Sequence, residues 1–353
     1  MTAADNSLTL TERLRGTLIG TAVGDALGLP AEGLGPARIR RLWHGDWRMR
    51  LVFGRGLLSD DTEHTFAVAQ ALAAHPDDAA LFQRALAARL RWWFLALPAG
   101  VGLATARACI KLCLSFSPAK SGVFSAGNGP AMRSALIGVF FYADPAQRIE
   151  FVRAATRLTH TDPKAETAAQ AVAAAAACAA NGASRDEFIG ALPTFSSEPE
   201  WSRAVGLLRA HLAASDSTAD FANALGLGGG VTGYAFHTVP VALFAWLRHP
   251  GDFATALTSA LACGGDTDTV GAIVGGIAGA ALGAEAIPAQ WKYRIRDFPL
   301  SLRKLDGAAR ALAEKRACPS LFWPARFVRN MVFLFIVLAH GFRRLLPPCS
   351  PRA

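Results

Sequence analysis

Two segments near opposite ends of the chain carry a glycine at every fourth position. The first is GTLIGTAVGDALG at 16–28, and the second, GAIVGGIAGAALG at 271–283, has the same spacing. Residues four apart share one face of an α-helix, and glycine weakens a helix, so such a ridge indicates close approach by another backbone. We therefore predict two helices that pack together and bring the N-terminal segment to the residues just before Gly271.

The composition favours helices throughout. Of 353 residues, 52% are hydrophobic and 33 are glycine, whereas only 3 are tyrosine. Alternating Val, Ile and Thr, which would indicate strands, are sparse. We predict an all-α fold.

An acidic cluster precedes the second glycine ridge. Asp266 and Asp268 alternate with Thr267 and Thr269 behind a pair of glycines. Carboxylates and hydroxyls crowded onto one turn repel each other unless a cation lies among them, and hard oxygen ligands suit Mg²⁺, Mn²⁺ or Ca²⁺. The alternative is that these residues only cap the helix that follows.

A second cluster of the same kind lies at 59–65. Ser59, Asp60 and Asp61 precede a helical pattern, and an N-terminal cap with Glu63 as its partner would account for one of the acids. Three acids and two threonines exceed what capping requires. Together the two clusters offer oxygen ligands for two divalent ions, which could orient a substrate and activate water.

Three further segments stand out between the clusters. Ser125-Ala-Gly-Asn-Gly-Pro-Ala-Met-Arg133 is a loop of small residues, and a helix beginning near Pro130 would present backbone N–H groups to a phosphate. His160 precedes an alanine-rich helix, where it could contact a ligand or serve as a structural histidine. The basic stretch 38–50 is expected to be irregular, as a surface flap or hairpin-like excursion.

Five motifs in this order resemble the ADP-ribosylglycohydrolase family over roughly residues 10–310. They are GDALGLPAEG (24–33), SDDTEHT (59–65), GNGPAMR (127–133), THTDP (159–163) and GGDTDTVGAIVGGIAGA (264–280). The resemblance implies a compact orthogonal multi-helix bundle with a binuclear Mg²⁺ or Mn²⁺ centre. It also implies hydrolysis of the bond between ADP-ribose and an acceptor.

The resemblance assigns roles by position. The metal ligands would be Ser59, Asp60, Asp61, Asp266, Asp268 and Thr269, with serine at 59 where the family usually has threonine. Glu32 or Asp61 would be the general base that takes a proton from water as it attacks the anomeric carbon. The diphosphate and distal ribose would contact Ser125, Gly127, Asn128, Gly129, Met132, Arg133 and His160.

Several alternatives stay open at this level. The acceptor is an ADP-ribosylated protein, with arginine slightly favoured over other side chains, or another molecule, and nucleic acid is not excluded. A different binuclear hydrolase of nucleotides or phosphorylated substrates, or a non-catalytic ADP-ribose-binding relative, would share part of the pattern. The four aspartates Asp60, Asp61, Asp266 and Asp268 are all present, which disfavours the last.

The C-terminal segment differs from the rest. We predict one domain over 1–316 and a basic, apolar helical tail over 317–353. Only thirteen residues separate Arg329 from Arg343, too few for a comfortable membrane span, so peripheral membrane contact through 326–346 or packing on the domain is favoured. With no apolar leader and no CxxC pair, the expected location is the cytoplasm.

Overall fold

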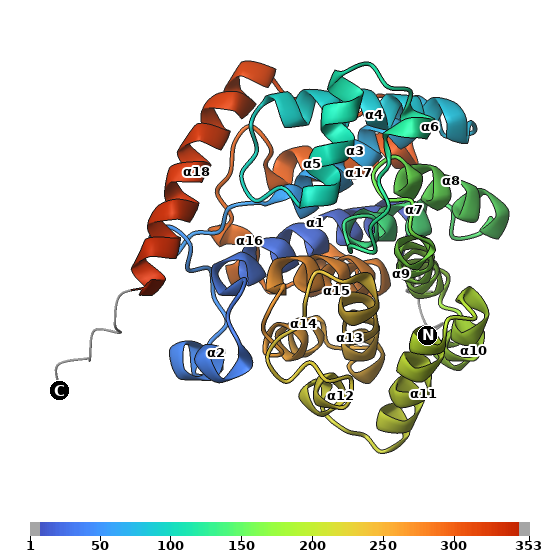
Figure 1. Ribbon diagram of the computed structural model, residues 1–353, viewed down its shortest axis with the longest axis vertical. Helices are drawn as coiled ribbons and strands as arrows, with labels where there is room; N and C mark the ends of the chain where they lie inside the picture. Colours follow the sequence, from blue (N-terminus) through green and yellow to red (C-terminus); the bar gives the residue numbers. More distant parts are fainter. Residues whose placement is uncertain (1–7, 346–353) are drawn as a thin grey trace, which may run out of the picture.

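The computed structural model describes residues 8–345, so the outermost residues of both predicted segments, 1–7 and 346–353, lie outside the described part. Within it the chain forms eighteen α-helices, and its β-pairing is limited to isolated bridges (Figure 1). The all-α prediction is confirmed. The helices are α1 Leu10–Gly28, α2 Pro36–Trp43, α3 Asp60–Ala74, α4 Ala79–Leu95, α5 Leu103–Cys113, α6 Pro118–Ser121, α7 Ser134–Phe140, α8 Pro145–Arg157, α9 Pro163–Asn181, α10 Arg185–Ala191, α11 Pro199–Ala213, α12 Thr218–Ala224, α13 Ala235–Arg248, α14 Phe253–Leu261, α15 Thr267–Leu282, α16 Ala289–Arg294, α17 Leu302–Ala313 and α18 Trp323–Leu345.

The two glycine ridges meet along their length. A Cβ atom built on Gly20 would lie 2.0 Å from the carbonyl oxygen of Gly275, and one on Gly24 would lie 1.9 Å from that of Gly271. A Cβ atom on Gly16 would lie 2.0 Å from the carbonyl oxygen of Gly279, so α1 and α15 run antiparallel in backbone contact. The predicted packing is confirmed, and it places the end of α1 beside the start of α15.

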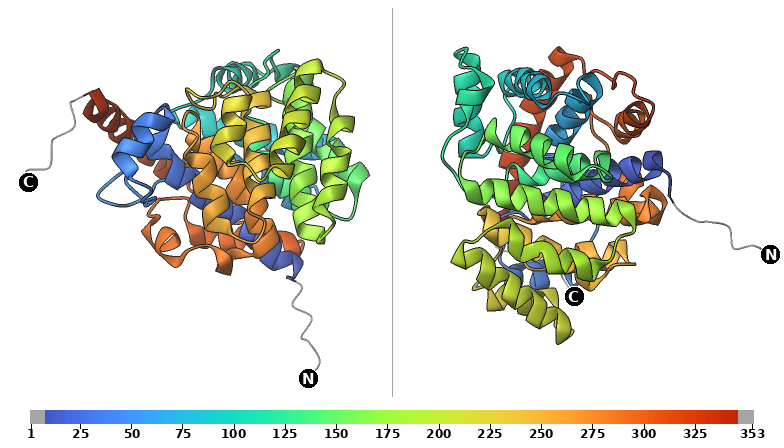
Figure 2. Two further views of the ribbon diagram at one scale, coloured as in Figure 1. Left: turned by 90° about the horizontal axis from the view of Figure 1, so that it is seen from below. Right: turned by 90° about the vertical axis from the view of Figure 1, so that its right-hand side faces the viewer.

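Helices α1 and α15 form the centre of the molecule. Helices α3, α7 and α17 pack on α1, whereas α9, α13 and α14 pack on α15 (Figures 1 and 2). Both central helices are buried over nearly their whole length, which explains why apolar and small residues occupy every face of their sequences. The loops at one end of this pair form the floor of the cleft described below.

The basic stretch after α1 is partly helical, which corrects the prediction of an irregular excursion. Helix α2 begins with Pro36 at its first turn and ends at His44 in the left-handed conformation. Ile39 and Trp43, four residues apart, are buried, whereas Arg40 and Arg41 are exposed. The segment is an amphipathic helix, and its many arginines made it look irregular in the sequence.

Helix α18 runs along one edge of the molecule (Figure 1). Its side facing the domain includes Asn330, whose amide donates to the carbonyl oxygen of Ala96 at 2.9 Å, and the buried Phe333. Among the described residues, the segment Trp323–Phe342 alone is long and apolar enough to cross a membrane by length and composition. Packing on the domain, one of the two predicted roles, is therefore observed.

Candidate active site

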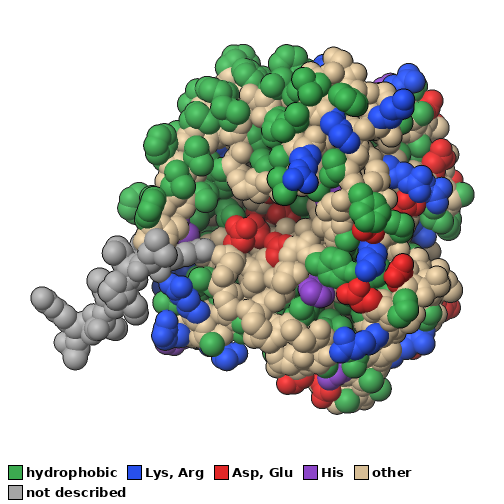
Figure 3. Space-filling model, in the orientation of Figure 1, with side chains coloured by type: hydrophobic (Ala, Val, Ile, Leu, Met, Phe, Trp, Pro, Cys, Tyr) green, Lys and Arg blue, Asp and Glu red, His purple; other side chains and the backbone are tan. Residues whose placement is uncertain are grey.

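A cleft of about 530 Å³ opens where α1 ends and α15 begins. In the space-filling view, acidic side chains gather at the centre of the face where the surface is hollowed (Figure 3). Five separate parts of the chain that the sequence singled out reach it. The predicted residues that line the cleft are Glu32, Asp60, Ser125, Gly127, Asn128, Gly129, Met132, His160, Asp266, Asp268 and Thr269.

The two acidic clusters join at Asp61. Its Oδ2 atom accepts a hydrogen bond from the Ser59 hydroxyl at 3.0 Å and another from the Thr269 hydroxyl at 3.3 Å. Asp61 is 1% exposed and lies behind the cleft surface together with Ser59. Residues more than two hundred positions apart in the chain therefore share one carboxylate.

The capping alternative accounts for little of this arrangement. Asp266 occupies the N-cap position of α15, but its side chain makes no capping bond. Its Oδ2 atom instead accepts from the Asn128 amide at 2.7 Å, which ties the acidic turn to the glycine loop. At α3, Ser59 does cap the helix, whereas Glu63 accepts from the Trp93 indole and forms no capping box.

The carboxylates lie in an unfavourable electrostatic environment. Burial raises the pKa of Asp60, Asp61 and Asp268 well above the usual aspartate value. The charges of neighbouring acids add to this effect, including Asp266 beside Asp61 and Glu32 beside Asp268. A site where several acids face one another in low dielectric strongly favours a bound cation.

Asp25 is a structural acid that the sequence analysis did not assign. Both of its carboxylate oxygens accept from the backbone N–H of Ser59, at 3.1 and 2.9 Å, and Oδ2 also accepts from the backbone and hydroxyl of Thr62. Burial raises its pKa to about 6, although these hydrogen bonds act in the opposite direction. Asp25 thus fixes the first turn of α3. Its position on the glycine-ridge helix was the only sequence feature that could have indicated this role.

Backbone pairing holds the cleft loops together. The N–H of Val231 donates to Gly264, the N–H of Asp266 donates to Val231, and Gly33 and Leu34 pair with Gly265. Gly264 and Gly265 both have positive φ angles, and a Cβ atom on Gly265 would lie 1.8 Å from the Val231 carbonyl oxygen. The Gly-Gly pair is therefore required for this close approach.

The glycine loop packs on a histidine ring. Cβ atoms at Gly127 and Gly129 would lie 3.0 and 3.2 Å from the ring of His160. Burial, followed by the charge of Arg133, lowers the pKa of His160 to about 3, so the imidazole is neutral. Its Nδ1 atom pairs with the Thr159 hydroxyl at 2.9 Å, and its Nε2 atom faces the glycine loop.

Two details of the predicted phosphate loop need correction. A 3₁₀ turn, Ala131–Arg133, follows Pro130 and leads into α7, so the α-helix begins at Ser134, later than predicted. The N–H groups of Ala131 and Met132 both donate to the Asn128 carbonyl oxygen. These N–H groups are satisfied within the protein and do not form a phosphate cradle. The loop instead contributes its surface and the side chains of Ser125, Asn128 and Met132.

Arg133 does not line the cleft. Its side chain is fully buried and donates to the Thr159 hydroxyl at 2.7 Å and to the carbonyl oxygen of Ala155 at 2.9 Å. A second guanidinium nitrogen contacts Nδ1 of His64 at 3.1 Å. The structure therefore gives Arg133 a positioning role behind His160, because Thr159 links the two side chains.

Two cleft segments were not assigned from the sequence. The stretch from Gly100 to Thr105 forms one wall, and Val231, Thr232 and Gly233 form another. The second contains a glycine-rich loop whose flexibility was visible in the sequence, but neither segment carries charged residues that would indicate chemistry. Their role follows only from the three-dimensional arrangement.

The donor set fits hard divalent cations. The Oδ1 atoms of Asp61 and Asp268 are buried without a hydrogen-bond partner. Within residues 8–345 the four aspartates of the two clusters form no ion pair with Lys or Arg, whereas Glu63 pairs with Arg326 at 3.7 Å. Over the same residues, no three His, Cys, Asp or Glu side chains stand close enough to form a metal-binding group on their own. The predicted set also uses the hydroxyls of Ser59 and Thr269, and carboxylate and hydroxyl oxygens are the ligands that Mg²⁺ and Mn²⁺ prefer.

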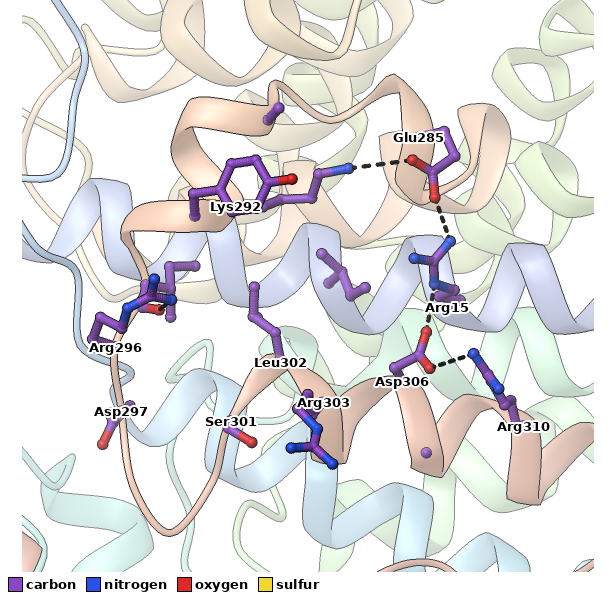
Figure 4. A pocket seen from close by; sticks show the side chains of 15 residues that line it. Arg15, Glu285, Lys292, Arg296, Asp297, Ser301, Leu302, Arg303, Asp306 and Arg310 are labelled. Atoms are coloured by element: carbon purple, nitrogen blue, oxygen red, sulfur yellow. Dashed lines mark hydrogen bonds and ion pairs between the residues drawn. The ribbon is translucent and has the colours of Figure 1, made fainter.

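A larger cavity, of about 820 Å³, lies between α1, α16 and α17 and is lined by none of the predicted residues. Its charges are mostly paired with one another. Arg15 bonds to Glu285 and Asp306, Asp306 also pairs with Arg310, and Lys292 lies 3.7 Å from Glu285 (Figure 4). These ion pairs link the helices around the cavity and leave the acidic cleft as the candidate active site.

Comparison with known proteins agrees with the family resemblance of the sequence motifs. The model of the ADP-ribosylglycohydrolase family matches residues 6–320. The chain is 29% identical to the ADP-ribosyl-[dinitrogen reductase] glycohydrolase of Rhodospirillum rubrum, over 80% of this chain and 90% of that protein. It is 26% identical to the ADP-ribosylhydrolase ARH3 of Gallus gallus, over 81% of this chain and 89% of that protein.

A solved structure, an ADP-ribosylglycohydrolase-related protein complex, superposes with a TM-score of 0.64 and 28% identity. The match covers 87% of this chain and 98% of that chain. The fold is all-α, and the family model places the chain among hydrolases. The chain belongs to the ADP-ribosylglycohydrolase family, whose members act on ADP-ribose linkages.

Proposed function

We propose that this chain is a metal-dependent hydrolase that removes ADP-ribose from a modified acceptor by two-metal activation of water. The observation that carries the proposal is the Thr269–Asp61 hydrogen bond, which joins acidic clusters from both ends of the chain at the floor of one cleft. A purely structural arrangement would not concentrate raised-pKa carboxylates beneath an open pocket.

Two Mg²⁺ or Mn²⁺ ions would be held by Ser59, Asp60, Asp61, Asp266, Asp268 and Thr269. When bound, such ions neutralise the acids, bind substrate hydroxyls and lower the pKa of water. Asn128 orients Asp266 through their 2.7 Å hydrogen bond, and Asp25 holds the turn that carries the first cluster. In this proposal the hydrogen bonds of Asn128 and Asp25 would hold the ligands in place before the ions bind.

Glu32 is the better placed of the two candidate bases. It lies on the cleft wall and is exposed, whereas Asp61 is buried and already accepts two hydroxyl hydrogen bonds. We assign to Glu32 the proton of the attacking water and to Asp61 a ligand role. Glu32→Gln should then lower kcat and leave Mn²⁺ affinity unchanged, while Asp61→Asn should weaken Mn²⁺ binding.

The acidic mouth of the cleft favours a cationic acceptor. Among the acids that line the cleft, Glu32 is exposed and is not a proposed metal ligand, so its carboxylate would attract a guanidinium and repel the phosphates of a nucleic-acid end. We therefore propose an arginine-type acceptor on a protein. His160, with its neutral ring beneath the glycine loop, contacts the bound ADP-ribose in this proposal.

The test is a release assay with purified chain and three substrates: ADP-ribosyl-arginine, ADP-ribosyl-serine and an ADP-ribosylated nucleic-acid end. We expect free ADP-ribose from the arginine substrate, loss of that activity with chelator, and recovery with excess Mn²⁺. Preference for serine or nucleic acid would overturn the acceptor assignment, and chelator-resistant release would overturn the metal mechanism. Asp268→Asn serves as the inactive reference and Glu187→Gln, an exposed acid on α10, as the matched control.

A further inference from the structure

Helix α18 turns its apolar face to solvent and several of its polar residues toward the domain. In a soluble helical protein the apolar stripe of a surface helix faces the core and the polar face meets water. Here Phe335 is 72% exposed and Phe342 is 68% exposed, whereas Asn330 is completely buried. The outward stripe follows helical spacing and consists of Val328, Val332, Phe335, Leu338 and Phe342.

Polar contacts fix which face of α18 points outward. The Arg329 guanidinium pairs with both carboxylate oxygens of Asp297, at 3.0 and 2.5 Å, and the two side chains are only 10% and 4% exposed. Asn330 donates to Ala96, and Nε2 of His340 lies 3.2 Å from the carbonyl oxygen of Pro30. The apolar stripe is therefore held away from the domain along most of the helix.

The exposed apolar surface continues beyond the helix. Phe322 and Phe298 are 70% and 66% exposed and border a groove of about 760 Å³ along α18. Phe53 is 99% exposed on a turn next to Val52, which packs against the small buried cluster that contains Phe333 of α18. Hydrophobic side chains gather over the upper left of the face in Figure 3, where α18 lies in Figure 1.

Positive charge flanks this surface at the far end of α18. The His340–Pro30 contact places this end of the helix beside the segment that leads into α2. Arg40 and Arg41 of α2 are exposed and form no salt bridge within residues 8–345. An apolar stripe bordered by arginines matches the acyl and headgroup layers of an anionic membrane.

We propose that the outward face of α18, together with Phe53, binds the surface of an anionic bilayer. The helix lies flat, with its phenylalanines at the acyl boundary and the arginines at the headgroups. A spanning orientation is disfavoured because it would separate Arg329 from the buried Asp297 carboxylate. Membrane binding of this kind is independent of the proposed catalytic activity.

The surface also adjoins the cleft. Ala96 accepts the Asn330 hydrogen bond, and Ala99 packs against the buried cluster that contains Phe333. Both shortly precede Gly100 and Leu103 of the cleft wall. Leu97 and Leu103 are themselves 55% and 66% exposed. Bilayer binding would therefore hold the cleft mouth near the membrane surface, where membrane-associated acceptors are concentrated.

The test is co-sedimentation of the full chain with phosphatidylcholine vesicles, with and without phosphatidylglycerol. We expect binding to the anionic vesicles that weakens with salt, and a fall of about tenfold per phenylalanine in Phe335→Ser/Phe342→Ser. Arg40→Glu/Arg41→Glu should lose the preference for anionic lipid. Ile149→Ser/Tyr293→Ser removes two exposed apolar side chains from α8 and α16 and should bind as the wild type does.

Three results would overturn the proposal. The wild-type chain could remain in the supernatant with anionic vesicles, or the α8/α16 control could lose as much binding as the α18 variant. Light scattering could also show a dimer that Phe335→Ser/Phe342→Ser dissociates, in a chain that binds no vesicles, which would assign the face to self-association. Both replaced phenylalanines point outward, so the variant should unfold at the wild-type temperature and remain testable.

Discussion

The contact between α1 and α15 can be tested with one methyl group. In Gly20→Ala the new Cβ would lie 2.0 Å from the Gly275 carbonyl oxygen, whereas ordinary contact begins at 3.4 Å. The helices therefore have to separate by roughly 1.4 Å, because neither backbone can rotate away inside a close-packed core. Overpacking of this kind costs about 2–3 kcal/mol, and alanine recovers about 1 kcal/mol through its higher helix propensity.

The net prediction is a loss of about 1–2 kcal/mol in the free energy of unfolding, measured by urea denaturation followed by circular dichroism. The matched control is Gly206→Ala in α11, where the new Cβ meets nothing within 4 Å. That change should stabilise the protein by about 0.5–1 kcal/mol. Equal or greater stability of Gly20→Ala relative to the wild type would refute the close-packing argument.

Other parts of the structure give three further predictions. Arg329→Ala leaves the Asp297 carboxylate buried without its cation and should lower the free energy of unfolding by about 3–5 kcal/mol. Adding Asp297→Leu in a double variant should restore part of this loss. An unchanged denaturation midpoint in Arg329→Ala would contradict the buried pair. Because the pKa of His160 is lowered in the folded protein, only the unfolded chain takes up a proton there between about pH 6 and pH 4. Over this range the free energy of unfolding of the wild type should fall by about 1.4 kcal/mol per pH unit relative to His160→Gln. Parallel stability curves for the two proteins would contradict a buried neutral imidazole. Asp25→Ala should weaken Mn²⁺ binding about 10–100-fold in equilibrium dialysis, because it frees the turn of Ser59, and undiminished affinity would show that this turn holds its shape alone.

Much of the fold could be predicted because its strongest constraint is local. The four-residue glycine spacing predicted α1 and its partner α15, and the two acidic clusters were placed at helix starts from their flanking patterns. Helix α2 was missed because three arginines lie beside Ile39 and Trp43, the two buried residues that carry the amphipathic signal.

The limits of sequence reasoning are clearest at the cleft. Arg133 and Asp25 are common residue types whose roles depend on burial, and a sequence does not show that Arg133 points behind the glycine loop or that Asp25 caps another helix. Likewise, the apolar run in α18 indicated an interfacial or packing helix, but only the contacts of Arg329 and Asn330 show which face is outward.

The central claim is that the two ends of the chain build one binuclear metal site. Equilibrium dialysis of metal-free protein against Mn²⁺ tests it directly, with Asp60→Asn from the first cluster, Asp268→Asn from the second and the exposed Glu187→Gln as control. We predict two ions per chain in the wild type and control, and weakened binding in either cluster variant. Absence of Mn²⁺ binding, or binding that survives both cluster substitutions, would contradict the account.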